Sequence, residues 1–166
     1  MWTRMIRLGG LGEQGMNKLG LLMALFFCIG CVSVQIPQYL QDKHPYKKEY
    51  FADYEKTLDA VKTVLKNSDW IIASTSDPSV FEATSQNKSS DGKKILLLTE
   101  NKQTSMLLFS RYTQLNIYIR ALKNSTEVEI RYEAITPLPF KQFRSYRNDS
   151  FIKKLFSGIQ AQLEKK

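Results

Sequence analysis

Hydrophobic and polar residues after position 50 recur at a spacing that predicts two helices. Apolar residues return every three or four positions in residues 54–65 and again in residues 152–163, the period of an amphipathic helix. Asp53 precedes the first segment and Asn148-Asp149-Ser150 precedes the second, and these residue types favour helix N-caps. The first helix is expected to end at Asn67-Ser68. The apolar positions are Tyr54, Leu58, Val61 and Leu65 in the first helix, and Ile152, Leu155, Phe156, Ile159 and Leu163 in the second.

Between these helices, short apolar runs predict strands. The clearest pair is 115–121 with 128–134, where apolar and polar residues alternate on either side of a turn at 123–125. This hairpin is expected to place Arg120 opposite a glutamate and to end, with the sheet, at Pro137 and Pro139. Its outer face is expected to carry Glu127, Glu129, Arg131 and Glu133. The other expected strands are 70–75, 80–85 and 95–99, with 50–52 as a short strand and 106–109 as either a strand or a helical turn.

The order of these elements predicts an α+β domain. An antiparallel sheet of about five to six strands would pack against an N-proximal helix and a C-terminal helix, because one apolar face of the sheet needs covering. This layout resembles the helix-grip architecture. Residues 54–65 followed by Trp70-Ile71-Ile72 resemble the opening helix and strand of small BamC-like periplasmic lipoproteins. A second resemblance is to START-like domains, which implies a hydrophobic ligand enclosed between the sheet and a long last helix.

The apolar run 19–34 is too short for a comfortable transmembrane helix and has the length of a signal-peptide core. Lys18 precedes it, and Cys28-Ile29-Gly30-Cys31 closes it. This ending resembles a bacterial lipobox, which implies cleavage between Gly30 and Cys31 and lipidation of Cys31, as by diacylglycerol and palmitate. The alternative is an uncleaved N-terminal anchor that contains Cys31 as an ordinary cysteine.

These features divide the chain into four expected parts. Residues 1–15 are rich in glycine and precede Met16, which we expect to be the true start. Residues 16–30 form the signal peptide, residues 31–48 the lipidated cysteine and its tether, and residues 49–166 a single α+β domain. Val32, rather than aspartate, follows the cysteine. In enterobacterial lipoproteins this favours the outer membrane, facing the periplasm, over the inner membrane.

The chain has 166 residues and a formal net charge of +8, which suits an acidic partner without identifying it. Lys141, Arg144 and Arg147 lie with Phe143 and Tyr146 in a basic aromatic segment that is expected to be a loop. This loop could contact an anionic surface, or its aromatic residues could pack beneath it while its basic groups stay solvated. Nucleic acid is not expected as a partner because the chain is expected to be exported.

The sequence predicts no catalytic residues, metal site or cofactor. Its one histidine, His44, lies in the expected tether, and its two cysteines, Cys28 and Cys31, lie in the signal segment. Catalysis by Ser-His-Asp or Cys-His is therefore not expected. We expect a membrane-tethered, non-enzymatic accessory or scaffold domain that meets an envelope protein partner. The alternative is a carrier for a hydrophobic ligand held between the sheet and the C-terminal helix, and a third reading is an enzyme that uses scattered carboxylates.

Overall fold

A computed structural model describes residues 36–41, 44–81, 92–105, 109–138 and 141–165. The chain forms two compact units, 1–33 and 34–166, and all of the described residues belong to the second. The signal segment with Gly30 and Cys31 lies outside the described residues, as do the expected strand at 82–85 and most of the segment 106–109.

The second unit is an α+β domain, as the sequence predicts. Its described part contains a seven-stranded sheet in which every pairing is antiparallel. The strands are β1 (Tyr46–Tyr50), β2 (Ile72–Ser76), β3 (Lys94–Thr99), β4 (Lys102–Ser105), β5 (Ser110–Ala121), β6 (Thr126–Leu138) and β7 (Lys141–Ser145). The helices are α2 (Tyr54–Asn67), the short 3-10 helix η1 (Pro78–Val80) and α3 (Asp149–Glu164).

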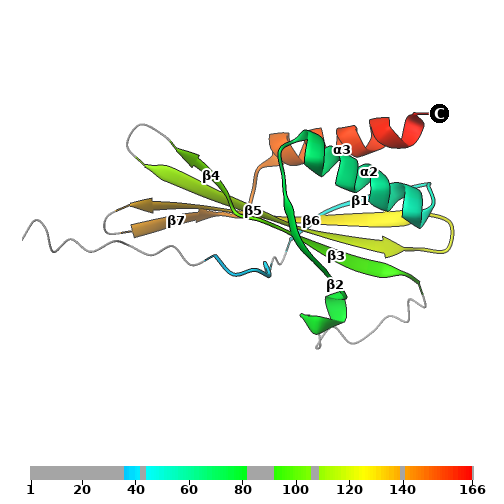
Figure 1. Ribbon diagram of the computed structural model, residues 1–166, viewed down its shortest axis with the longest axis horizontal. Helices are drawn as coiled ribbons and strands as arrows, with labels where there is room; N and C mark the ends of the chain where they lie inside the picture. Colours follow the sequence, from blue (N-terminus) through cyan, green and yellow to red (C-terminus); the bar gives the residue numbers. More distant parts are fainter. Residues whose placement is uncertain (1–35, 42–43, 82–91, 106–108, 139–140, 166) are drawn as a thin grey trace, which may run out of the picture. The chain divides into compact units, whose positions relative to one another are not determined.

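The two long strands β5 and β6 form the predicted hairpin and run the length of the sheet (Figure 1). At one end of the hairpin β1 pairs with β6, while β3 pairs with β5 and carries β2 on its outer side. At the other end β7 pairs with β6 and β4 pairs with β5. The ion pair between Arg120 Nη2 and Glu127 Oε1, at 2.6 Å, confirms the expected contact across the hairpin.

Both long helices lie on the same face of the sheet (Figure 1). Asp53 caps α2 by accepting from the backbone N–H of Glu55 at 3.0 Å, and Asn148 caps α3 by accepting from that of Phe151 at 3.2 Å. Both predicted helix starts are therefore confirmed. The apolar helix faces and the helix-side residues of the sheet form one core, which includes Val61, Leu65, Leu115, Ile117, Ile119, Val128, Ile130, Ile152, Leu155 and Ile159.

The helices touch each other at Gly158. A Cβ at this position would lie 3.2 Å from Cγ1 of Val64 on α2, so the glycine lets the two helices approach closely. Apolar side chains of α3 occupy the space beneath that helix: Ile152, Leu155 and Ile159 are 1%, 3% and 2% exposed. This is the space that the carrier alternative assigns to a ligand.

The sheet differs from the expectations in four places. Pro137 does not end it, because β6 continues to Leu138, paired there with β7. The pairing between β6 and β5 stops at Ile135. On that side of β6 no neighbouring strand needs a backbone N–H from residue 137, so a proline, which lacks this donor, is tolerated there. Residues 141–145 are a strand rather than a loop. Residues 101–103, which the sequence predicts as a turn, overlap β4, which runs from Lys102 to Ser105. Residues 78–80, where the expected strand 80–85 begins, form a 3-10 helix.

Candidate functional site

Residues 36–41, which we call the strap, lie across the face of the sheet opposite the helices. The expected tether contained these residues, but the strap packs against the domain, and Leu40 within it is only 2% exposed. The first three residues of β1, Tyr46 to Lys48, also lie inside the range expected for the tether. The part of the domain that the structure describes therefore begins at Ile36, five positions after Cys31.

Polar side chains on the central strands hold the strap in place. Asn116 accepts from the backbone N–H of Leu40 at 2.6 Å, and its own amide donates to the carbonyl of Gln38 at 3.1 Å. Gln114 donates to the same carbonyl at 3.2 Å. Gln114 and Asn116 are 3% and 0% exposed, so these bonds satisfy amide groups that water does not reach. Among the described residues, the buried Oε1 of Gln114 has no hydrogen-bond partner.

Arg131 on β6 attaches the next part of the strap. Its guanidinium donates to the carbonyl of Leu40 at 3.2 Å and to the hydroxyl of Tyr39, and it lies 5.2 Å from the centre of the Tyr39 ring. The ring of Tyr39 in turn stacks on Phe81, with 4.9 Å between the ring centres. The strap is therefore fixed by its backbone and by two of its side chains, Tyr39 and Leu40.

The outer face of β6 is less exposed than the alternation of its residues suggested. Glu129 and Glu133 are 4% and 2% exposed. Glu129 pairs with Lys47 at 3.0 Å and with Arg131 at 2.7 Å, and Glu133 pairs with Arg144 at 3.1 Å. Neighbouring basic groups thus compensate the charge of these buried carboxylates. Carboxylates on a strand face turned to solvent would not need such partners. Sequence alternation marked these positions as polar, but it held no signal for the strap and for β7 beside them.

The basic aromatic segment does not present three similar cations. Arg144 is paired with Glu133, and Arg147 lies 3.3 Å from Asp149 and donates to the carbonyl of His44 at 3.2 Å. Among the described residues Lys141 has no ion pair, and its Nζ lies 4.9 Å from the ring centre of Phe143. The candidates are therefore distributed along β7 and the segment after it, rather than gathered at one point.

The aromatic residues of this segment are turned outward. Phe143 and Tyr146 are 50% and 42% exposed, so they do not pack beneath a loop. The hydroxyl of Tyr46 donates to Asp149 at 2.5 Å, and this bond together with Arg147 lowers the pKa of the Asp149 carboxyl. The exposed rings and the single unpaired lysine are the features of this edge that a partner could contact.

None of the described helices is long and apolar enough to cross a bilayer. Within the described ranges, no three histidine, cysteine, aspartate or glutamate side chains gather where they could hold a metal ion. No protein-family model and no curated protein matches this chain.

Proposed function

We propose that this chain is a bacterial envelope lipoprotein, tethered through a lipid on Cys31, whose α+β domain acts as a docking module beside the membrane. The observation that carries the proposal is the apolar run 19–34 with Lys18 before it and Gly30-Cys31 at its end. Several acyl chains on one cysteine would anchor the domain stably, whereas one chain would anchor it only marginally.

The strap supports a short tether. Between Cys31 and Ile36, where the described strap begins, the chain contains four residues. Five Cα steps span at most about 17 Å, whereas the roughly 17 residues expected as a tether after Cys31 span at most about 55 Å. Because the strap crosses the face opposite α2 and α3, this geometry favours turning that face toward the membrane and the helix face toward the periplasm. Confinement near a surface raises the effective concentration of the domain for partners on the same membrane.

The contacts of the buried carboxylates and of α3 favour a docking module over the enzyme and the carrier alternatives. The buried carboxylates Glu129 and Glu133 form ion pairs with Lys47 on β1 and Arg144 on β7, which does not favour an enzyme that uses scattered carboxylates. The close packing of α3 on the sheet does not favour a carrier with a ligand beneath that helix. The outer membrane, on its periplasmic side, remains the proposed location.

Metabolic labelling tests the lipid anchor, and the chain offers a matched control. The full chain would be expressed in a Gram-negative host with an alkyne fatty acid, and its label read after coupling to a fluorophore. We expect label on the wild type and on Cys28→Ala, and none on Cys31→Ala, which should also accumulate in the uncleaved form. A label that persists in Cys31→Ala would refute the proposal, as would a label lost only in Cys28→Ala.

A further inference from the structure

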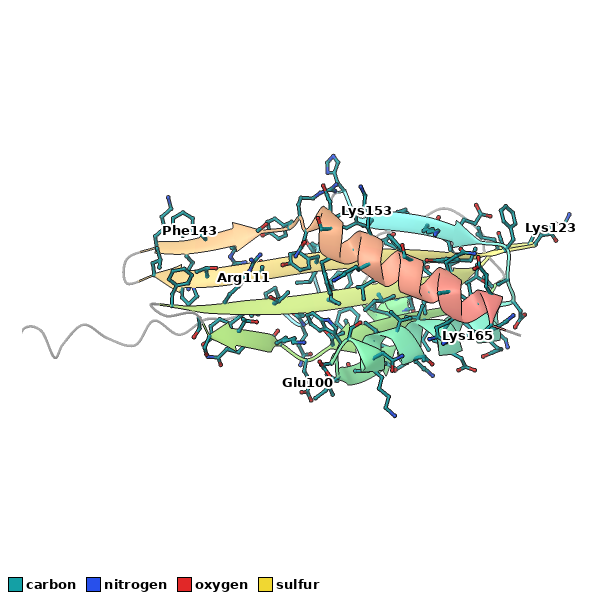
Figure 2. The ribbon with its side chains drawn as sticks, turned by 90° about the horizontal axis from the view of Figure 1, so that it is seen from above. Glu100, Arg111, Lys123, Phe143, Lys153 and Lys165 are labelled. Carbon is teal, nitrogen blue, oxygen red and sulfur yellow. The ribbon has the colours of Figure 1, made fainter. Side chains whose placement is uncertain are left out.

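The helix layer leaves one end of the sheet uncovered. Figure 2 shows Arg111 and Phe143 at this end, beyond the first turn of α3. Where the helix layer stops, a groove of about 270 Å³ opens between the start of α3, the end of α2 and strands β4, β5 and β6. This groove is not beneath α3, so it differs from the ligand space of the carrier alternative.

Aromatic rings form the wall of the groove on its buried side. Trp70 and Tyr132 are 7% and 2% exposed. The ring of Phe151 lies 6.0 Å from that of Trp70 and 6.2 Å from that of Tyr132, measured between ring centres. The ring of Phe151 thus packs against both other rings, tilted by 41° from Trp70 and by 53° from Tyr132. Together the rings offer an apolar wall, which suits the ring system of a small molecule.

Two cations lie at the same groove. Lys102 Nζ is 5.7 Å from the centre of the Trp70 ring and donates to the carbonyl of Ser68 at 3.3 Å. Arg111 donates from Nη2 to the hydroxyl of Tyr132 at 3.1 Å. Neither cation forms an ion pair with any described residue, unlike Lys47, Arg120 and Arg144 elsewhere on the sheet.

The lining contains no aspartate or glutamate. Asn148, the N-cap of α3, lines the groove, and its amide donates to the hydroxyl of Tyr132 at 3.4 Å. The positive end of the α3 dipole therefore adds to the two cations. Asp149, the acidic residue in the first turn, is engaged with Tyr46 and Arg147 and is not part of the lining.

We propose that this groove binds a small organic anion that carries an apolar ring system. The ring system lies against Trp70 and Phe151, and the anionic group lies between Lys102 and Arg111. The volume of about 270 Å³ lies just below the roughly 300–1,000 Å³ of pockets that bury drug-sized ligands, which suits a small ring system. The site belongs to the folded domain and does not depend on whether Cys31 carries a lipid.

The full chain with Trp2→Phe gives a direct test, because Trp70 is then its only tryptophan. The probes are 1-anilinonaphthalene-8-sulfonate and N-phenyl-1-naphthylamine, which differ by one sulfonate. We expect the sulfonate probe to quench Trp70 emission saturably and to bind more tightly than the neutral probe, with a preference that weakens in high salt. Lys102→Gln and Arg111→Gln should each weaken the sulfonate probe by about tenfold and leave the neutral probe unchanged.

Lys141→Gln is the matched control, because Lys141 also lies over an exposed aromatic ring but outside the groove. It should leave both affinities unchanged. Far-ultraviolet circular dichroism of each variant checks folding, and Lys102→Gln removes no bond to a buried side chain. Equal affinities for the two probes would overturn the proposal. So would binding without quenching of Trp70, or a loss in Lys141→Gln as large as that in Lys102→Gln.

Discussion

Replacing Leu40 by alanine should release the strap from the sheet while the rest of the domain stays folded. Leu40 is 2% exposed, and removing a buried leucine side chain typically costs about 2–5 kcal/mol. The strap lies at the start of the described domain, so it can leave the sheet without moving a strand of the hairpin. The loss to global stability is therefore limited to the free energy with which the strap docks.

Hydrogen exchange measured by mass spectrometry reports on the strap directly. The backbone N–H of residue 40 donates to Asn116 and is protected only while the strap is docked. A loss of about 2 kcal/mol in docking free energy should speed exchange in residues 36–41 by roughly 30-fold, since 1.4 kcal/mol corresponds to a factor of ten. Exchange in β5 and β6 should change much less.

Gln41→Ala is the control, because Gln41 is exposed and lies in the same segment. It should leave exchange in residues 36–41 close to that of the wild type. Unchanged exchange in Leu40→Ala would refute the reasoning, because it would mean that the strap is held without this side chain. An equal rise across β5 and β6 would show that the strap is instead part of the global folding unit.

Two further predictions concern the helix layer. Gly158→Val should lower the free energy of unfolding by about 1–3 kcal/mol in urea titrations, because the new side chain meets Val64. Adding Val64→Ala to the same chain should recover part of this loss. If the losses of the two single variants simply add in the double variant, the contact between the two positions is contradicted. Burial raises the pKa of Tyr50, whose hydroxyl donates to the carbonyl of Phe156 at 3.0 Å, so the folded state favours the neutral phenol. The stability that this preference contributes is complete below about pH 10, the usual pKa of an unfolded tyrosine, and is lost as the pH rises above that value. Tyr50→Phe should therefore cost about 1 kcal/mol of unfolding free energy at pH 8. Between pH 9 and 11 the variant should lose less further stability than the wild type. An identical alkaline loss in both proteins would exclude Tyr50 as its source.

Local sequence patterns predicted the elements whose stabilising contacts are nearby in the chain. Asp53 and Asn148 cap their helices through the backbone two or three residues later, and the alternation in 115–121 and 128–134 specified the hairpin. These signals depend on short-range spacing, so a single sequence is enough to detect them. The α+β class followed because two amphipathic helices and a half-apolar sheet can bury their apolar faces against each other.

The strap, β7 and the groove depend on contacts between distant residues. Asn116 is a polar position in the predicted strand 115–121, and Gln114 lies directly before that strand. Only the chain folding back from residues 36–41 buries them. Residues 141–145 looked like a loop because prolines precede them and their charges are dense, but pairing with β6 makes them a strand.

The sequence by itself determined which segments form the two long helices and the central hairpin. It also contains the Gly30-Cys31 pattern on which the proposed membrane location rests. The tertiary structure decided where polar residues end up. It buries Glu129 and Glu133 beside basic partners and brings Trp70, Lys102, Arg111 and Asn148 from four separate segments to one groove. The physical reason is that the desolvation and pairing of a charge depend on every segment packed around it, and sequence spacing encodes only the nearest of these.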